Sequence, residues 1–231
     1  MSDFLARSLF FGAGISLLFY EVGLLLKKRF KLAVLNPLLI AILCVMASLK
    51  VLGVPYSDYN AGAQYLSWLL TPATVALAVP LYEELGLLRK NLPAVAGGIL
   101  AGTFAGLAGI LLLCRVFALD HQLYVTFLPK SITTAIGMGV AEELGGVAAL
   151  TVAAIILTGI LGALMAEMVC KVCHITHPIA RGIGIGTAAH AVGTSKALQM
   201  GEVEGAMSGL AVAVAGVMTA ILCPVFSSFI S

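Results

Sequence analysis

A stretch of small, flexible residues near the C-terminus, RGIGIGTAAHAVGTSKAL (181–198), brings together side chains that can bind or transfer charge. It contains the imidazole of His190, the ammonium of Lys196 and three hydroxyl groups close to them, those of Thr187, Thr194 and Ser195. The spacing of Thr187, His190 and Thr194 places them on one face of a helix. Titratable groups inside a membrane are costly and usually face a cavity or a partner. In apolar surroundings this pattern favours a substrate path.

Two of these groups also have structural interpretations. His190 could be a neutral imidazole bonded to a neighbouring carbonyl, and Lys196 could extend to the membrane surface. The glycines of the stretch weaken a continuous helix, and we expect a break near Gly193. Thr194 or Ser195 would then cap a half-helix, whose first amides and dipole favour a negative charge. The alternatives stay open at this point.

Two other segments have the pattern of interrupted helices. The sequence WLLTPATVALAVPLYEELG places Thr71-Pro72 inside an apolar run, which is typical of a helix start. TVALAVPLYEELG (74–86) and TTAIGMGVAEELG (133–145) align without a gap and share Thr, Ala, Glu, Glu, Leu and Gly. Paired interrupted segments in two halves of a chain indicate a transporter binding site. The hydroxyls and lysine of PKSITT (129–134) add donors for an anion.

The sequence thus predicts a site for a small carboxylate, assembled from several segments. The candidate substrate-binding residues are Thr74, Lys130, Ser131, Thr133, Thr134, His190, Thr194, Ser195 and Lys196. The candidates for proton coupling are His190, Glu202 and Glu204, although carboxylates at segment ends are more commonly solvated. The expected helix breaks are at Asn36, Pro37, Thr71, Pro72, Pro129 and Gly193.

The composition defines the protein class. Of the 231 residues, 61% are hydrophobic and 10% are charged, whereas soluble domains have about a quarter charged residues. Spanning a bilayer takes roughly 20 apolar residues. The apolar segments are expected at about 4–26, 32–53, 62–82, 92–118, 127–141, 147–170, 179–199 and 205–230. We therefore predict an all-α polytopic integral membrane protein, a single domain over 1–231 with about 7–8 membrane segments.

The orientation of the second repeat copy depends on one segment. The basic cluster at 27–31 should be cytoplasmic, and simple counting then gives both copies the same direction. If 127–141 is re-entrant, the second copy is inverted, as is usual in transporters. We favour this inverted arrangement. In the segment 92–118, Gly98, Gly102 and Gly106 form a stripe typical of close helix packing.

Other chemistries have little support. CKVCH (170–174) fits a haem-attachment pattern, and Cys170, Cys173, His174 and His177 have plausible metal spacing. This stretch is the tail of an apolar helix, so we expect no metal and no cofactor. The cysteines are expected to be buried thiols. With no catalytic triad or nucleotide-binding pattern, we expect no enzyme, and without a basic patch we expect no nucleic acid partner.

The segments LPKSITTAIGMGVAEELGG, HPIARGIGIGTAAHAVGTSKALQMGEVEGAMSGLA and NPLLIAIL with LTPATVALAVPLY resemble the LrgB/CidB family of bacterial membrane proteins. The resemblance extends from about residue 8 to 226, and a plastid glycolate/glycerate translocator has a similar module. The family pattern matches Asn36-Pro37, Pro72-Ala73-Thr74, Pro129-Lys130-Ser131, Thr133-Thr134, His190, Gly193-Thr194 and Glu202-Val203-Glu204-Gly205. Ser195 stands where the family often has alanine, and CKVCH is outside the pattern.

The resemblance implies two functions. One is transport of monocarboxylates such as pyruvate, glycolate or glycerate across the bacterial inner membrane, which the interrupted helices also favour. The other is a holin/antiholin-like control of murein hydrolase activity and lysis. The candidate protein partners are a small LrgA/CidA-like membrane protein and a second copy of the chain in a homodimer.

Overall fold

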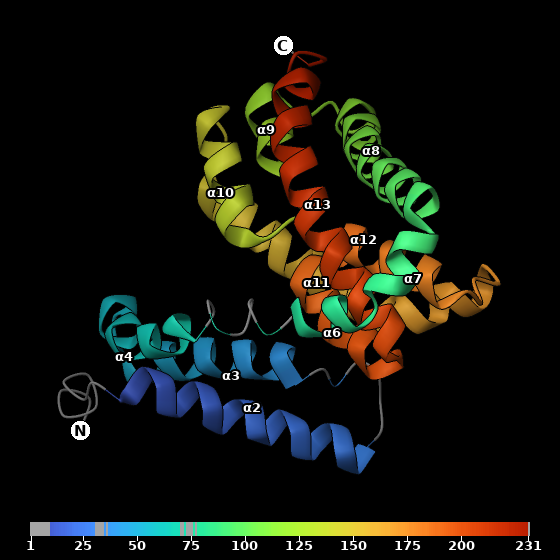
Figure 1. The fold of residues 1–231 in the computed structure, drawn as a ribbon. Helices are drawn as coiled ribbons and strands as arrows, with labels where there is room; N and C mark the ends of the chain where they lie inside the picture. Colours follow the sequence, from blue (N-terminus) through green and yellow to red (C-terminus); the bar gives the residue numbers. More distant parts are fainter. Residues whose placement is uncertain are drawn as a thin grey trace. The chain divides into compact units, whose positions relative to one another are not determined.

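The computed structural model describes residues 10–30, 35, 37–69, 72, 76 and 78–230, and every regular element among them is a helix (Figure 1). Three of these helices are long and apolar enough to cross a membrane: α8 (Leu92–Val116), α11 (Ala148–Val172) and α13 (Glu202–Ser227). A shorter apolar helix, α3, spans Pro37–Leu52. The prediction of an all-α membrane protein is confirmed. The number of membrane segments stays a prediction.

The long helices expose bulky apolar side chains on their outer faces. On α8, Leu100 and Phe104 are 53% and 56% exposed, and on α11, Leu157 and Leu161 are 56% and 55% exposed. In water such apolar faces would be unfavourable, whereas lipid tails are a matching solvent for them. The fold is therefore that of a protein surrounded by lipid.

The chain divides into two compact units, residues 1–76 and 77–231. In the first unit, α2 (Phe11–Phe30) packs against both α3 and α4 (Tyr56–Trp68). The Ser16 hydroxyl donates to the Gly12 carbonyl at 2.7 Å and bonds the Tyr59 hydroxyl at 2.9 Å. Of the helix breaks expected in this unit, Pro37 is the first residue of α3.

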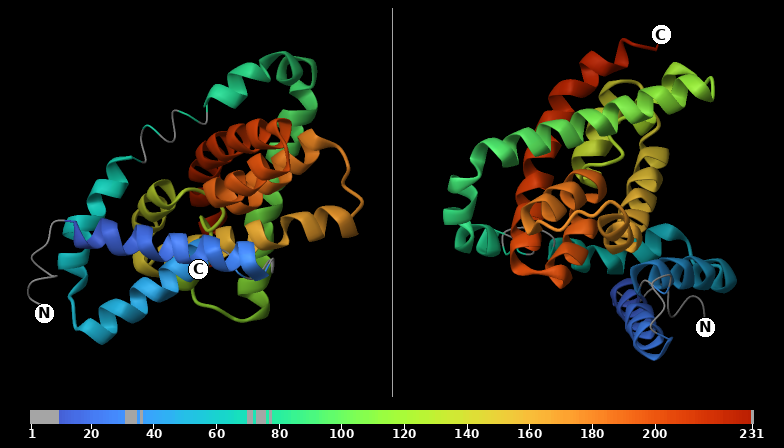
Figure 2. Two further views of the ribbon diagram at one scale, coloured as in Figure 1. Left: turned by 90° about the horizontal axis from the view of Figure 1, so that it is seen from below. Right: turned by 90° about the vertical axis from the view of Figure 1, so that its right-hand side faces the viewer.

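The second unit is built around α13 and its partner α12 (Pro178–Met200). It also contains the short helices α6 (Ala78–Glu83), α7 (Leu85–Lys90), α9 (His121–Phe127) and α10 (Thr134–Glu143). α13 contacts α6, α8, α9, α10 and α12, and α12 also packs on α8 and α11. Figures 1 and 2 show α12 and α13, orange and red, side by side. This unit contains the candidate site.

Glycines let α12 and α13 approach closely. A Cβ atom added to Gly182 would lie 2.8 Å from Met207 Cβ, and one added to Gly186 would lie 2.8 Å from Ala211 Cβ. Both distances are shorter than any normal contact between carbon atoms. The glycines of the 181–198 stretch therefore have a packing role as well as a conformational one.

The expected membrane segment at 127–141 is not one helix. α9 ends at Phe127 and α10 begins at Thr134, with a turn that contains buried Pro129 between them. Their 7 and 10 residues give lengths of about 10 and 15 Å, against roughly 30 Å for the hydrocarbon core. Neither helix can span a membrane alone. Helix ends at that depth are tolerated where protein or a cavity surrounds them.

The two aligned segments end differently. Gly145, after α10, has a φ of 83°, in the left-handed region that favours glycine. Its counterpart Gly86 lies inside α7 and continues the helix. Thr71 and Thr74 of the first segment lie outside the described residues, as does Asn36, and Pro72 is exposed. The inverted repeat and the single domain stay predictions.

Tyr124 joins α9 to the end of α13 inside the second unit. Its side chain is fully buried and its hydroxyl donates to the Phe226 carbonyl at 2.7 Å. Tyr124→Phe is expected to lower the free energy of unfolding by about 1 kcal/mol, because the carbonyl loses its partner. The measurement is the thermal midpoint of the purified protein in detergent. Tyr82→Phe, at a 77% exposed position, is the control, and an equal effect of both changes would contradict the prediction.

Candidate functional site

Helix α12 is interrupted in its middle, at Ala189 and His190. Ala189 has φ −132° and ψ 17°, and His190 has φ 41° and ψ −144°, outside the helical region. The sequence predicted a break near Gly193, and the structure has it three residues earlier, at His190. Gly193 is helical and tightly packed, since an added Cβ would lie 2.7 Å from Ala189 Cβ and 2.9 Å from Ile185 Cγ2. A positive φ at a residue other than glycine costs about 1–3 kcal/mol and is typical of functional sites.

Hydrogen bonds within α12 and to α11 and α13 surround the break. His190 is 4% exposed, and its Nε2 lies 2.9 Å from the Ile155 carbonyl oxygen of α11. A carbonyl oxygen can only accept, so Nε2 is the protonated nitrogen that donates. The Thr194 hydroxyl donates to the His190 carbonyl at 3.1 Å and bonds the Ser208 hydroxyl of α13 at 2.8 Å. The structural alternative for His190, a bond to a neighbouring carbonyl, is therefore present.

Gly159 makes room for the imidazole. A Cβ atom added there would lie 2.6 Å from His190 Cε1 and 2.7 Å from Nε2. The ring thus packs directly on the α11 backbone, four residues after the carbonyl that it bonds. The position of His190 depends on a residue far from it in the sequence.

A small cavity of about 10 Å³, with room for about one water-sized group, lies near this part of α12, since Thr187, two residues before Ala189, is in its wall. It is lined from α8, from the turn before α10, from α12 and from α13, by Gly102, Thr103, Gly106, Leu107, Leu128, Ser131, Thr187 and Thr219. Half of these residues have hydroxyl groups and none is a carboxylate. The lining is therefore polar and neutral at the depth of otherwise apolar helices.

Lys130 is not in the cavity wall, but it is bonded to Ser131, which is. Lys130 is partly buried, and its ammonium donates to the Ser131 hydroxyl at 3.1 Å. The structure therefore brings Lys130 and Ser131 together, whereas His190 bonds Ile155 of α11, and the partly buried Thr133 and Thr134 lie at the start of α10.

The last three predicted residues of the 181–198 stretch divide between two faces of α12. Thr194 is buried against α13, whereas Ser195 is exposed and bonds the Val192 carbonyl of its own helix. Lys196 does not line the cavity and forms an ion pair with Glu167 of α11. The structure therefore does not bring Lys196 together with Lys130, and a role for Lys196 in substrate binding stays a prediction.

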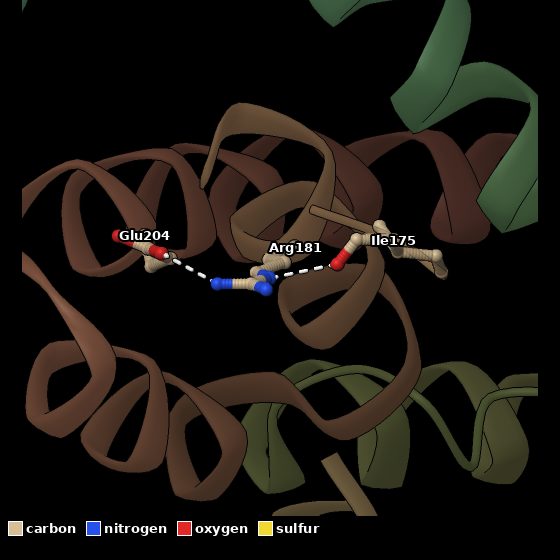
Figure 3. A network of polar contacts seen from close by, with 3 residues as sticks. All are labelled: Ile175, Arg181 and Glu204. Carbon is tan, nitrogen blue, oxygen red and sulfur yellow. Dashed lines mark hydrogen bonds and ion pairs between the residues drawn. The ribbon is translucent and has the colours of Figure 1, made fainter. Parts of the chain in front are cut away.

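The two acidic candidates differ in environment. Glu202 is exposed, whereas Glu204 is 7% exposed and lies 3.7 Å from Arg181, measured from Oε1 to Nη1. Arg181 also donates from Nε to the Ile175 carbonyl at 2.8 Å, so it lies between the two partners (Figure 3). This ion pair fastens the start of α12 to the start of α13. Their role in proton coupling stays a prediction.

The C-terminal end of α11 contains the residues with metal-like spacing. Cys170 is buried, whereas Cys173 and His174 are exposed and His177 precedes α12. Within the described ranges, no group of three His, Cys, Asp or Glu side chains is placed to hold a metal ion. All the cysteines are free thiols; Cys114, Cys170 and Cys223 are buried and Cys44 is partly buried.

Sequence reasoning missed two residues of the cavity wall, Thr103 and Thr219. Each is an isolated threonine in a long apolar helix, where hydroxyls commonly bond the helix backbone. The available signal for Thr103 was its place in the glycine stripe, since Gly102 and Gly106 also line the cavity. We interpreted that stripe as packing, which is correct for Gly102, because an added Cβ would lie 2.6 Å from Thr187 Oγ1.

Comparisons with known proteins show to which family this chain is related. Residues 16–229 match the LrgB-like family. The chain belongs to that family. It is 35% identical to the antiholin-like protein LrgB of Bacillus mycoides strain KBAB4 over 222 residues, which is 96% of each chain. The antiholin-like LrgB proteins of Bacillus cereus strains B4264 and AH187 are equally similar to this LrgB-like chain. No solved structure matches it.

Proposed function

We propose that this LrgB-like chain moves a small organic anion across the bacterial cytoplasmic membrane. The observation that supports it best is the break of α12 at Ala189–His190, which follows two residues after Thr187 in the wall of a hydroxyl-lined cavity. Interrupted helices at membrane depth are typical of transporter binding sites, and backbone of this kind is tolerated where it lines a cavity. Continuous packed helices would be sufficient for a protein that only contacts a partner.

The charge of the site favours an anion. The ammonium of Lys130 donates to Ser131 in the cavity wall, and the lining residues include no carboxylate. Hydroxyl and ammonium donors suit a carboxylate, which only accepts hydrogen bonds. We propose monocarboxylates such as pyruvate, glycolate or glycerate as substrates, with transport coupled to protons.

The test is uptake by the purified protein in liposomes. Labelled pyruvate, glycolate, glycerate and lactate are offered with and without a proton gradient. Saturable uptake of any of them supports transport, and stimulation by an inward proton gradient supports coupling. No uptake by folded, correctly inserted protein would overturn the proposal.

Lys130→Gln is expected to reduce the rate of uptake about three- to tenfold, because it removes a charge-assisted interaction worth about 1 kcal/mol or more. Uptake at several substrate concentrations measures the change. Lys196→Gln is the comparison, since Lys196 is paired with Glu167 and does not line the cavity. A larger loss of uptake in Lys196→Gln than in Lys130→Gln would indicate that the substrate site lies on the other face of α12.

The name of the relatives favours a second function. Proteins that are 35% identical over almost the whole chain are named antiholin-like. We propose as the alternative that the chain modulates murein hydrolase activity and lysis with a small LrgA/CidA-like membrane partner. Lysis assays of a Lys130→Gln strain separate the two functions. Normal lysis control by a variant that has lost uptake would favour the partner-dependent role.

A further inference from the structure

The hydroxyl of Thr103 is unusual for a threonine in a membrane helix. Thr187 donates to the Ile183 carbonyl at 2.8 Å, and Thr126 donates to the Gln122 carbonyl at 2.6 Å, each four residues back. Thr103 is 5% exposed and its Oγ1 has no hydrogen-bond partner among the described residues. A buried hydroxyl without a hydrogen-bond partner costs free energy of folding, which indicates that the Thr103 hydroxyl has a role that offsets this cost.

The surroundings of Thr103 contain further donors. Ser131 accepts the Lys130 ammonium at 3.1 Å, so its own hydrogen remains available for another acceptor. Thr219 adds a hydroxyl from α13 and is also 5% exposed. The hydrogen of Thr187 is already used within its helix. Donors from α8, from the turn before α10 and from α13 thus meet at one cavity.

The net charge near the cavity distinguishes between ligands. Hydroxyl groups alone would suit a water molecule, a cation or an anion. The ammonium of Lys130, one hydrogen bond behind Ser131, disfavours a cation and favours a negative ligand. Leu107 and Leu128 supply the apolar part of the wall.

We infer that one oxygen of a substrate carboxylate binds in this cavity, with Thr103, Ser131 and Thr219 as its hydroxyl donors. The inference rests on the proposed transport function and extends it to two residues, Thr103 and Thr219, that the family pattern does not include. The ligand class is a short carboxylate, one oxygen of which accepts these hydrogen bonds. Lys130 supports the site through Ser131.

The glycines of α8 provide a steric test with a matched control. A Cβ atom added to Gly106 would meet Ser131 Oγ at 4.0 Å and no closer atom, so alanine fits without strain and occupies cavity space. A Cβ atom added to Gly109, on the same helix, would meet nothing within 4 Å. Gly106→Ala and Gly109→Ala therefore give the same gain in helix propensity, and they differ only in that the methyl group of Gly106→Ala takes up cavity space.

The experiment measures KM for pyruvate and glycolate uptake and the thermal midpoint of the substrate-free protein, for four proteins. These are the wild type, Thr103→Val, Gly106→Ala and Gly109→Ala. We expect KM to rise about two- to tenfold in Thr103→Val, the loss of one hydrogen bond. KM should also rise in Gly106→Ala and stay unchanged in Gly109→Ala. The midpoint of Thr103→Val should be equal to or above that of the wild type.

The outcomes separate the site from the function. If the wild type transports and both Thr103→Val and Gly106→Ala keep its KM, the cavity holds water or nothing, and this inference is overturned while transport stands. If the midpoint of Thr103→Val falls clearly, Thr103 has a structural partner and the argument from its orphaned hydroxyl fails. If the wild type takes up none of the acids and none of them raises its thermal midpoint, the proposed function fails and the inference fails with it.

Discussion

Replacing Arg181 with glutamine is expected to lower the free energy of unfolding by about 2–3 kcal/mol, the cost of losing one charged hydrogen bond and leaving the largely buried Glu204 carboxylate without its ion-pair partner. Arg181 contacts both Glu204 and the Ile175 carbonyl. The Glu204 side chain is 9% exposed, so water compensates for little of the loss. The thermal midpoint in detergent measures the effect.

A double variant identifies the cause. In Arg181→Gln with Glu204→Gln the unpaired carboxylate is gone, so this protein should be more stable than Arg181→Gln alone. Lys171→Gln, at an exposed position at the end of α11, controls for the loss of a positive charge. If the double variant is as unstable as the single one, the loss comes from the Ile175 contact or from packing.

Replacing Gly159 with alanine is expected to have the largest effect on transport. The methyl group would occupy the position of the His190 ring, so the ring must move and lose its bond to the Ile155 carbonyl. We expect an uptake rate reduced about tenfold or more, and a free energy of unfolding lowered by about 2–4 kcal/mol through overpacking and the lost hydrogen bond. Liposome uptake and the thermal midpoint check both.

Gly159→Ala has two controls. One is a glycine where an added methyl group has free space, and the other is a double variant that removes the His190 ring with which the methyl group would clash. Gly184→Ala, in α12, adds a methyl group that meets nothing within 4 Å and should keep wild-type uptake. Gly159→Ala combined with His190→Ala should be no less stable than His190→Ala alone, since the two side chains no longer compete for space. Additive losses would show that Gly159 acts independently of the ring.

The long helices could be predicted because their signal is local. The apolar segments expected at 92–118 and 147–170 correspond to α8 at Leu92–Val116 and α11 at Ala148–Val172. Continuous apolar runs of this length have few alternatives in a membrane protein. The glycine stripe of α8 likewise predicted close packing, which occurs against Thr187.

The site was only partly predictable because its geometry depends on contacts between distant residues. The position of the α12 break depends on Ile155 and Gly159 of α11, which receive the His190 ring. Lys196 was grouped with His190 by sequence proximity, although it bonds Glu167. Thr103 and Thr219 belong to helices whose threonines look unremarkable one at a time. Only the folded arrangement distinguishes them.

The glycine contacts between α12 and α13 have a mechanical consequence. Where Gly182 and Gly186 lie against Met207 and Ala211 there is no space for even one added carbon atom, so sliding one helix along the other would require them to separate first. The N-terminal half of α12 is also linked to α13 through Arg181 and Glu204. After the Ala189–His190 break, Leu198 packs just as closely on Gly205 and Thr194 bonds Ser208, so the break bends α12 without freeing either half from α13.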